Sequence, residues 1–139
     1  MKINHKLTES MRIRANRLSI ANALYNIVNN ATQHAKDVRV VLSQEGNMVK
    51  IEIIDNGGGI APEFLVINPS TGRPYLFDMN VSQTKSGTGL GTTEAWYAIK
   101  DTGGRIDVKS KLSKGTTFTI YLPIAATRIE KPQELDTAL

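Results

Sequence analysis

Residues 49–59 read VKIEIIDNGGG, an apolar run that passes directly into an aspartate and three successive glycines. The apolar residues Val49, Ile51, Ile53 and Ile54 predict a strand over 49–54. Asp55 then stands at a strand end, where its carboxylate can accept a hydrogen bond from an exocyclic amine, and the glycines would let a flat ring pack on bare backbone. Asp-Asn-Gly is also common turn chemistry, but three glycines exceed what a turn needs. We interpret the stretch as part of a binding site.

A second glycine-rich stretch, Gly87-Thr88-Gly89-Leu90-Gly91, opens a helix-like run. Free backbone N–H groups at a helix start attract phosphate oxygens. The stretch is not a Walker A loop, because no Gly-Lys-Ser or Gly-Lys-Thr follows. It is not a Rossmann fingerprint either, because the spacing differs and no strand directly precedes it. It therefore predicts a phosphate site, and Lys85 is either a further phosphate contact or an ordinary exposed lysine.

A helix is predicted over residues 19–35, with Ser19 as its cap and one apolar face. That face contains Ile20, Leu24, Ile27, Val28 and Ala31. The opposite face is polar and contains Asn22, Asn26, Asn29, Asn30 and Gln33. Asparagine is a poor helix former, so this enrichment needs an explanation: taken alone it favours a solvated polar face, and a binding function is the alternative. Asn26 and Asn30 lie four residues apart on one side, and their amide oxygens suit Mg²⁺.

The predicted elements follow the order helix, hairpin, loop, helix, hairpin. The second helix spans 91–102 and ends at Gly103-Gly104. Residues 56–86 are irregular apart from a short helix over 61–67 that begins at Pro62, and a loop of this length is usually functional. Two hairpins pair 38–42 with 49–54 across a 44–47 turn, and 105–111 with 116–122 across Lys114-Gly115. This order predicts an α+β two-layer sandwich, with helices on one face of a mixed, mostly antiparallel sheet.

The 139 residues suit one compact domain over 18–124, with a helical or extended lead-in at 1–17 and a polar tail at 125–139. The absence of cysteine excludes disulfides and thiolate metal sites. We expect a cytoplasmic protein without membrane contact by this domain, because no apolar stretch reaches the length of a span. The basic residues near the N-terminus have no interleaved aromatics, so we expect no nucleic-acid binding.

Three motifs stand together in the chain: Asn26-x-x-x-Asn30-Ala31, Asp55-x-Gly57-x-Gly59 and Gly87-x-Gly89-Leu90-Gly91. They resemble the N, G1 and G2 boxes of the GHKL ATPases, the Bergerat-fold superfamily that includes gyrase B, Hsp90, histidine kinases and MutL. Residues 18–124 look most like the catalytic ATP-binding domain of a bacterial sensor histidine kinase. That group's phenylalanine box is similar to Leu76-Phe77-Asp78, and its closing strands are similar to residues 103–106 and 114–118.

The resemblance implies ATP and Mg²⁺ as ligands, and a role for each motif. Asn30 would coordinate the Mg²⁺, and Asp55 would accept a hydrogen bond from the adenine amino group. Asn26 stands where gyrase-like members carry a general-base glutamate, and an amide cannot take a proton from water. The implied adenine pocket contains His34, Gly57, Gly59 and Ile60, although His34 reads equally as a surface histidine. The implied phosphate contacts are Lys85, Gly87, Thr88, Gly89, Leu90 and Gly91, within or beside an ATP lid at 62–86.

The resemblance also implies phosphoryl transfer to a histidine on a separate dimerisation domain, with a response regulator as an indirect partner. His5 is not that histidine, because it lies too close to the asparagine box. We therefore expect the chain to be the ATP-binding part of a longer kinase. If that kinase is a membrane sensor, this domain would belong to its cytoplasmic part.

Departures from the family pattern keep two alternatives open. Gln33 stands where many histidine kinases carry a lysine or arginine, and Thr92-Thr93-Glu94 and Trp96-Tyr97 are unusual in the second helix. A non-catalytic module that binds nucleotide or docks a partner is one alternative. An anti-sigma-type serine kinase is the other, and Asn26 argues against it.

Overall fold

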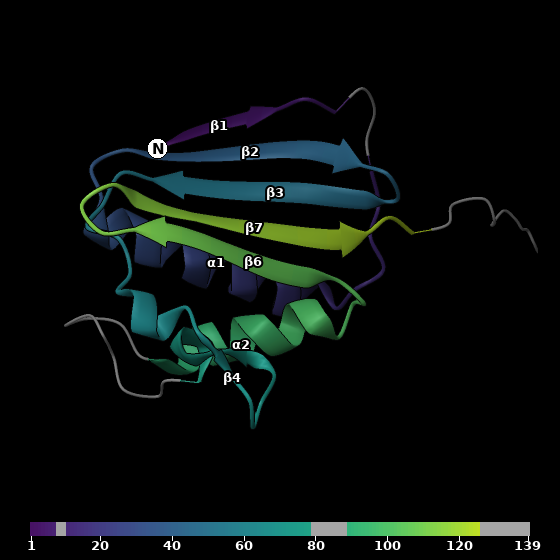
Figure 1. Ribbon diagram of the computed structural model, residues 1–139. Helices are drawn as coiled ribbons and strands as arrows, with labels where there is room; N and C mark the ends of the chain where they lie inside the picture. The colour runs from purple at the N-terminus through teal and green to yellow at the C-terminus, as the bar shows by residue number, and fades with distance from the viewer. Residues whose placement is uncertain (8–10, 79–88, 126–139) are drawn as a thin grey trace, which may run out of the picture.

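The computed structural model describes residues 1–7, 11–78 and 89–125, and of residues 89–92 the backbone alone (Figure 1). A five-stranded sheet forms one layer, and the two α-helices lie together on one of its faces. The strand order is β1-β2-β3-β7-β6, with β1 parallel to β2 and every other pair antiparallel. The strands are β1 (Lys2–His5), β2 (Val38–Glu45), β3 (Met48–Asp55), β6 (Arg105–Lys111) and β7 (Gly115–Pro123). This mixed two-layer sandwich confirms the predicted fold class.

The first helix, α1 (Arg17–His34), forms where the apolar spacing predicts it. Its side toward the sheet buries Ile20, Ala23, Ile27 and Ala31. The predicted cap at Ser19 is wrong, because the helix begins earlier: the side-chain oxygen of Asn16 accepts a hydrogen bond from the Ser19 backbone N–H at 3.0 Å. An asparagine ahead of the first turn satisfies one of the backbone donors that a helix start leaves open.

Both predicted hairpins are present, with tighter turns than the sequence indicated. The β2–β3 turn contains Gly46 and Asn47 only, with Gly46 at a φ of 59°. Of the predicted Lys114-Gly115 turn, Lys114 is confirmed and Gly115 is wrong, because Gly115 already belongs to β7 and the turn occupies residues 112–114. A Cβ atom at Gly115 would collide with the backbone oxygen of Asp55, so the close approach of these strands requires glycine there.

The second helix, α2 (Gly89–Lys100), begins and ends two residues earlier than the predicted 91–102. Gly103 follows it in a left-handed conformation with a φ of 87°, as is common after a helix end. The segment between β3 and α2 carries η1 (Pro62–Phe64), β4 (Ile67–Asn68), β5 (Arg73–Pro74) and η2 (Tyr75–Phe77). The short helix predicted over 61–67 is thus a single 3-10 turn that begins at Pro62. Residues 79–86 of the predicted loop lie outside the described residues.

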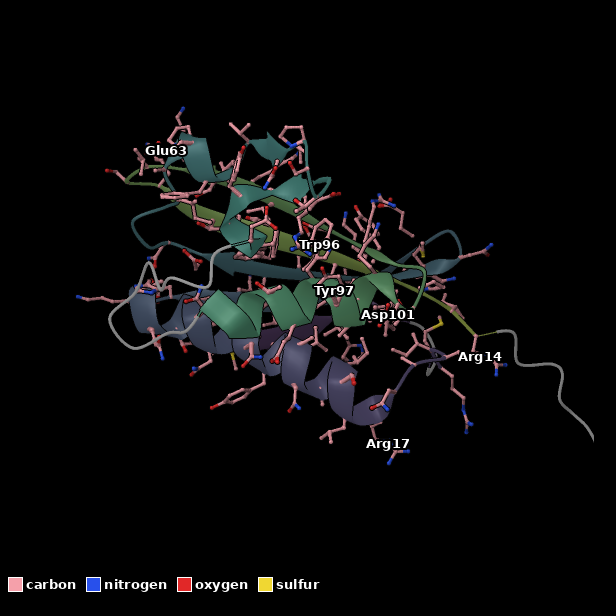
Figure 2. All side chains as sticks on the ribbon, turned by 90° about the horizontal axis from the view of Figure 1, so that it is seen from below. Arg14, Arg17, Glu63, Trp96, Tyr97 and Asp101 are labelled. Atoms are coloured by element: carbon pink, nitrogen blue, oxygen red, sulfur yellow. The ribbon has the colours of Figure 1, made fainter. Side chains whose placement is uncertain are left out.

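The core lies between the sheet and the two helices (Figure 2). Phe77 is fully buried there, and its ring packs against Trp96, at 5.0 Å between centroids, and against Phe118, at 6.4 Å. The irregular segment is therefore anchored to both layers by one aromatic side chain. The same core contains the other largest fully buried side chains of the described residues, all of them aliphatic: Ile53, Ile99, Ile120 and Leu122. Among the described helices, none is long and apolar enough to cross a membrane.

Candidate functional site

A cavity of about 190 Å³ opens between the last turns of α1 and the end of β3. The structure brings five of the residues predicted from the sequence around it: Asn30, His34, Asp55, Gly59 and Ile60. The helix supplies the first two, and the β3 end with the glycine-rich stretch supplies the others. Residues that are far apart in the chain therefore converge on one cavity.

The Asp55 carboxylate is held by backbone groups through one of its oxygens. Its Oδ1 accepts hydrogen bonds from the N–H of Gly57 at 2.8 Å and from the N–H of Thr116 at 3.3 Å. Within the described residues, no group donates a hydrogen bond to the second oxygen, Oδ2. The carboxylate is thus oriented by the fold and keeps an acceptor oxygen for a ligand in the cavity that it lines.

Two glycines of the stretch are required by close backbone approaches. A Cβ atom at Gly57 would lie 2.6 Å from the backbone oxygen of His34. Gly59 has a φ of 81°, and a Cβ atom there would collide with the backbone oxygen of Lys111. Gly58 and Gly59 line the cavity, so this part of its wall carries no side chains, whereas Gly57 packs against the end of α1 and is not among the lining residues.

Side-chain hydrogen bonds fix this wall from both sides. Asn56 and Asp37, which precedes β2, exchange two of them: the Asn56 amide donates to the Asp37 carboxylate at 3.0 Å, and the Asp37 N–H donates to Asn56 Oδ1 at 3.1 Å. On the other side, Ser110 Oγ accepts from the Ile60 N–H at 2.7 Å. Because both ends of the glycine-rich stretch are held, the site is preorganised rather than a loose loop.

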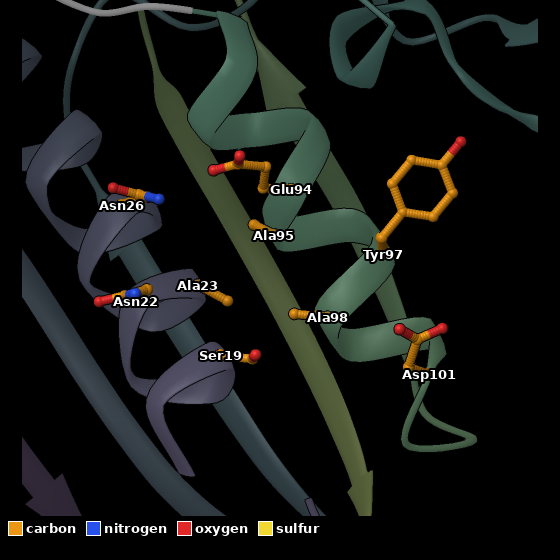
Figure 3. A pocket seen from close by; sticks show the side chains of 9 residues that line it. All are labelled: Ser19, Asn22, Ala23, Asn26, Glu94, Ala95, Tyr97, Ala98 and Asp101. Carbon is orange, nitrogen blue, oxygen red and sulfur yellow. The ribbon is translucent and has the colours of Figure 1, made fainter. Parts of the chain in front are cut away.

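Asn30 and Asn26 lie on one side of α1 but face different spaces. Asn30 lines the cavity, whereas Asn26, one turn earlier, lines a groove between α1 and α2 (Figure 3). Neither side-chain amide makes a hydrogen bond with another described residue. An amide oxygen at the cavity edge is a donor type that Mg²⁺ accepts, usually together with phosphate oxygens. Asn30 therefore fits the implied metal.

The second glycine-rich stretch lies largely beyond the described part of the chain. Lys85, Gly87 and Thr88 fall outside the described residues. Gly89, Leu90 and Gly91 form the first turn of α2, as the sequence predicted for a stretch that opens a helix. Their role as phosphate contacts stays a prediction.

Next to this stretch, Asp78 closes the hairpin of β4 and β5. Its carboxylate pairs with the Arg73 guanidinium and accepts from the Asn68 amide at 2.8 Å and the Thr71 hydroxyl at 2.9 Å. Burial raises the pKa of the Asp78 carboxyl, but the three hydrogen bonds outweigh it and hold that pKa below its ordinary value. The Arg73 guanidinium in turn lies over the Tyr97 ring, 4.9 Å from its centroid.

Sequence reasoning missed Thr116, a buried polar residue that lines the cavity. Its backbone N–H holds Asp55, and its hydroxyl lies 2.8 Å from Ser110 Oγ. The contact depends on the register that pairs Asp55 with Thr116 across β3 and β7. The sequence does not reveal this register, because the two strands lie far apart in the chain. The predicted strand 116–122 indicated only that Thr116 begins a strand. Phe118, Ala31 and Gly58 also line the cavity without having been predicted.

Residues 15–126 match the family of histidine kinase-, DNA gyrase B- and HSP90-like ATPases. The chain belongs to this family. The sensor protein SrrB of Staphylococcus aureus (strain NCTC 8325 / PS 47) is 39% identical over 103 residues, which cover 72% of this chain and 17% of SrrB. This ATPase domain therefore spans about a sixth of the length of the curated relatives it matches. The recognition of the superfamily from the three motifs is confirmed.

Solved structures agree on the fold of this ATPase domain. The catalytic domain of histidine kinase ThkA, in a nucleotide-free form, gives a TM-score of 0.69 at 23% identity and covers 88% of this chain and 76% of ThkA's. Full-length ShkA in complex with AMPPNP gives a TM-score of 0.65 at 24% identity, covering 89% of this chain and 26% of ShkA's. At these identities the likeness supports the sandwich fold alone.

Proposed function

We propose that this chain is the catalytic ATP-binding domain of a sensor histidine kinase, and that it transfers the γ-phosphoryl group of ATP to a histidine on a separate phosphoacceptor domain. One observation carries the proposal: the fixed carboxylate of Asp55 keeps a spare oxygen at a cavity whose wall at Gly58 and Gly59 carries no side chains. Family membership and the similarity to SrrB support it. The ATP-binding unit would be residues 18–124, with 1–17 and 125–139 flanking it.

Asp55 and the glycines would select adenine. Oδ2 of Asp55 would accept a hydrogen bond from the exocyclic amine, and the backbone at Gly59 would pack against the ring. Gly57 would shape the pocket indirectly, because it lets the stretch approach the end of α1. His34 and Ile60 would lie at the edges of the base or ribose, since both line the cavity. The solved structure of ShkA holds AMPPNP on the same fold, which supports an adenine nucleotide as the ligand.

The phosphates would extend from this cavity toward the start of α2. Asn30 would hold Mg²⁺, which neutralises the phosphate charge when bound. Lys85 and the stretch from Gly87 to Gly91 would contact the phosphates through an ammonium group and helix-start N–H groups. Catalysis would rest on positioning and charge neutralisation, as expected for phosphoryl transfer. Asn26 carries no basic group, which favours a kinase over a fast hydrolase.

Calorimetry with AMPPNP and Mg²⁺ tests the nucleotide part of the proposal. We expect binding with a dissociation constant below about 1 mM, the upper end of the usual range of substrate affinities. Adenosine alone should compete, because the carboxylate contact involves the base. A folded protein that shows no heat of binding at millimolar nucleotide would overturn the proposal.

Gln33 and the unusual second helix keep one other function in view, a nucleotide-binding module without catalysis. The two proposals differ only in the transfer step. Incubation with γ-labelled ATP and the cognate phosphoacceptor domain should label its histidine with the kinase and leave it unlabelled with the module. The comparison needs wild-type affinity for ATP to be measured on the same preparation.

A further inference from the structure

A groove of about 330 Å³ runs between α1 and α2, on the side of the helices that faces away from the sheet (Figures 2 and 3). Three alanines form its floor: Ala23 and Ala95 are buried, and Ala98 is half-buried. Small side chains on facing helices leave room for a third element to approach the backbone closely, because the distance between packed helices depends on the side chains at the contact.

The two walls of the groove are regular stripes of polar side chains. On α1, Ser19, Asn22 and Asn26 follow one another at intervals of three and four residues. On the other wall, Glu94 lies on α2 and Asp101 directly follows Lys100, the last residue of that helix. Figure 3 shows the helices running in opposite directions, so that Asn26 and Glu94 lie at one end of the groove and Ser19 and Asp101 at the other.

The groove is negatively charged on a molecule whose formal net charge is +4. Its lining residues include two carboxylates and no lysine or arginine. Within the described residues, the carboxylates of Glu94 and Asp101 form no ion pair, and the Asn22 amide forms no hydrogen bond. The cost of Asn22 to the helix is not explained by the nucleotide site, which it does not line.

We propose that this groove docks a helix of the phosphoacceptor domain through basic side chains. The inference rests on the proposed function and names the surface that this function needs. The groove ends at Asn26 and Glu94, one turn from Asn30 and from the first turn of α2, so a helix seated in it reaches toward the region assigned to the phosphates.

The spacing of the carboxylates specifies the chemistry of the partner. The helix rises about 9 Å from Glu94 to its last residue, Lys100, and Asp101 follows directly. The two carboxylates therefore match two lysines or arginines placed roughly two turns apart on a facing helix. The alanine floor favours small residues between them, and the asparagine amides can donate to or accept from polar groups of the partner. Such charge complementarity raises the rate of encounter and fixes the register of docking.

The test uses Asp101→Lys, which lies at the end of the groove remote from the nucleotide cavity. With the cognate phosphoacceptor domain supplied in trans, we expect its KM to rise at least about tenfold, because like charges then face one another. The kcat at saturating partner and the affinity for AMPPNP should stay within about twofold. Asp107→Lys is the matched control: it makes the same charge change at an exposed position of β6, outside the groove, and should leave the KM unchanged.

Asn22→Ala separates docking from stability. Alanine is the better helix former, so the unfolding temperature should stay equal or rise while the KM for the phosphoacceptor domain increases. Equal effects of Asp101→Lys and Asp107→Lys would overturn the proposal in favour of general electrostatics. An unchanged KM in Asp101→Lys, or self-association of the wild-type chain that this variant abolishes, would also overturn it. Failure of the wild type to bind AMPPNP would instead reject the proposed function.

Discussion

Asp55 and Asp78 both accept hydrogen bonds that hold the chain around them, but they differ in whether a carboxylate oxygen remains without a partner. Oδ1 of Asp55 holds two backbone N–H groups while its Oδ2 has no described donor. Both oxygens of Asp78 are taken, by Arg73 on one side and by Asn68 and Thr71 on the other. A carboxylate with one bonded oxygen is oriented and can still accept a hydrogen bond from a ligand, whereas one with both oxygens bonded stabilises the fold. The comparison separates a carboxylate that can contact a ligand from a structural one.

The first and largest expected effect tests the spare oxygen. In Asp55→Asn the amide oxygen can still accept from the backbone, but the group that faces the cavity becomes an NH₂ donor, which opposes the adenine amine. We expect calorimetry to show an affinity for AMPPNP lower by about 10-fold to 100-fold, since a hydrogen bond to a charged group contributes roughly 1.5–3 kcal/mol. The unfolding temperature should change little.

Guanine nucleotides provide the control for this variant. GTP carries a carbonyl where ATP carries its amine, so the wild type should prefer ATP strongly and Asp55→Asn should lose most of that preference. An Asp55→Asn protein with wild-type affinity for AMPPNP would show that Oδ2 does not contact the base, and the contrast with Asp78 would lose its functional meaning.

The Asp55 end of the cavity could be predicted from the sequence because its signals are local. A strand that ends in Asp55 and runs into glycines encodes both the carboxylate and the part of the wall at Gly58 and Gly59 that carries no side chains. Thr116 could not be found this way, since its contact depends on the strand register between β3 and β7. The Asp37 and Asn56 pair was missed for the same reason, because turn chemistry in one segment does not reveal the partner in another.

The sequence also misplaced details that depend on competition between neighbouring residues. Ser19 and Asn16 are both good helix caps, and the periodicity of the apolar residues does not decide between them. Asp78 was noted only as part of a phenylalanine box, because the hairpin that brings Arg73 back to it has strands of two residues each. Elements this short carry no periodic signal.

A second, smaller effect tests the structural carboxylate. Asp78→Asn removes the charge opposite Arg73, whose side chain is only 12% exposed. We expect chemical denaturation to show a loss of about 1–3 kcal/mol in the free energy of unfolding, because a buried charge then lacks its partner. Adenosine affinity should stay within about twofold, since Asp78 does not line the cavity.

Asp107→Asn is the matched control for stability, because its pairing with Arg105 at 3.5 Å is half exposed and such pairs contribute little. A stability loss in Asp107→Asn equal to that in Asp78→Asn would assign the effect to net charge. A large loss of adenosine affinity in Asp78→Asn would mean that the two aspartates are not functionally distinct.

The smallest effect is a pH dependence that should belong to Asp78. Its pKa lies below the ordinary value of 3.8, so folding favours the ionised carboxyl. The corresponding stabilisation is complete above about pH 5 and is lost as the pH falls through 3.8 toward the lower pKa of the folded protein. The wild type should therefore exceed Asp78→Asn in unfolding free energy by a constant amount near neutral pH, and this difference should shrink below about pH 4. NMR titration of the Asp78 side-chain carbonyl carbon measures the pKa of this carboxyl group directly in the folded protein. A midpoint at or above 3.8 would show that the three hydrogen bonds do not outweigh burial, and that Asp78 is less committed than its contacts indicate.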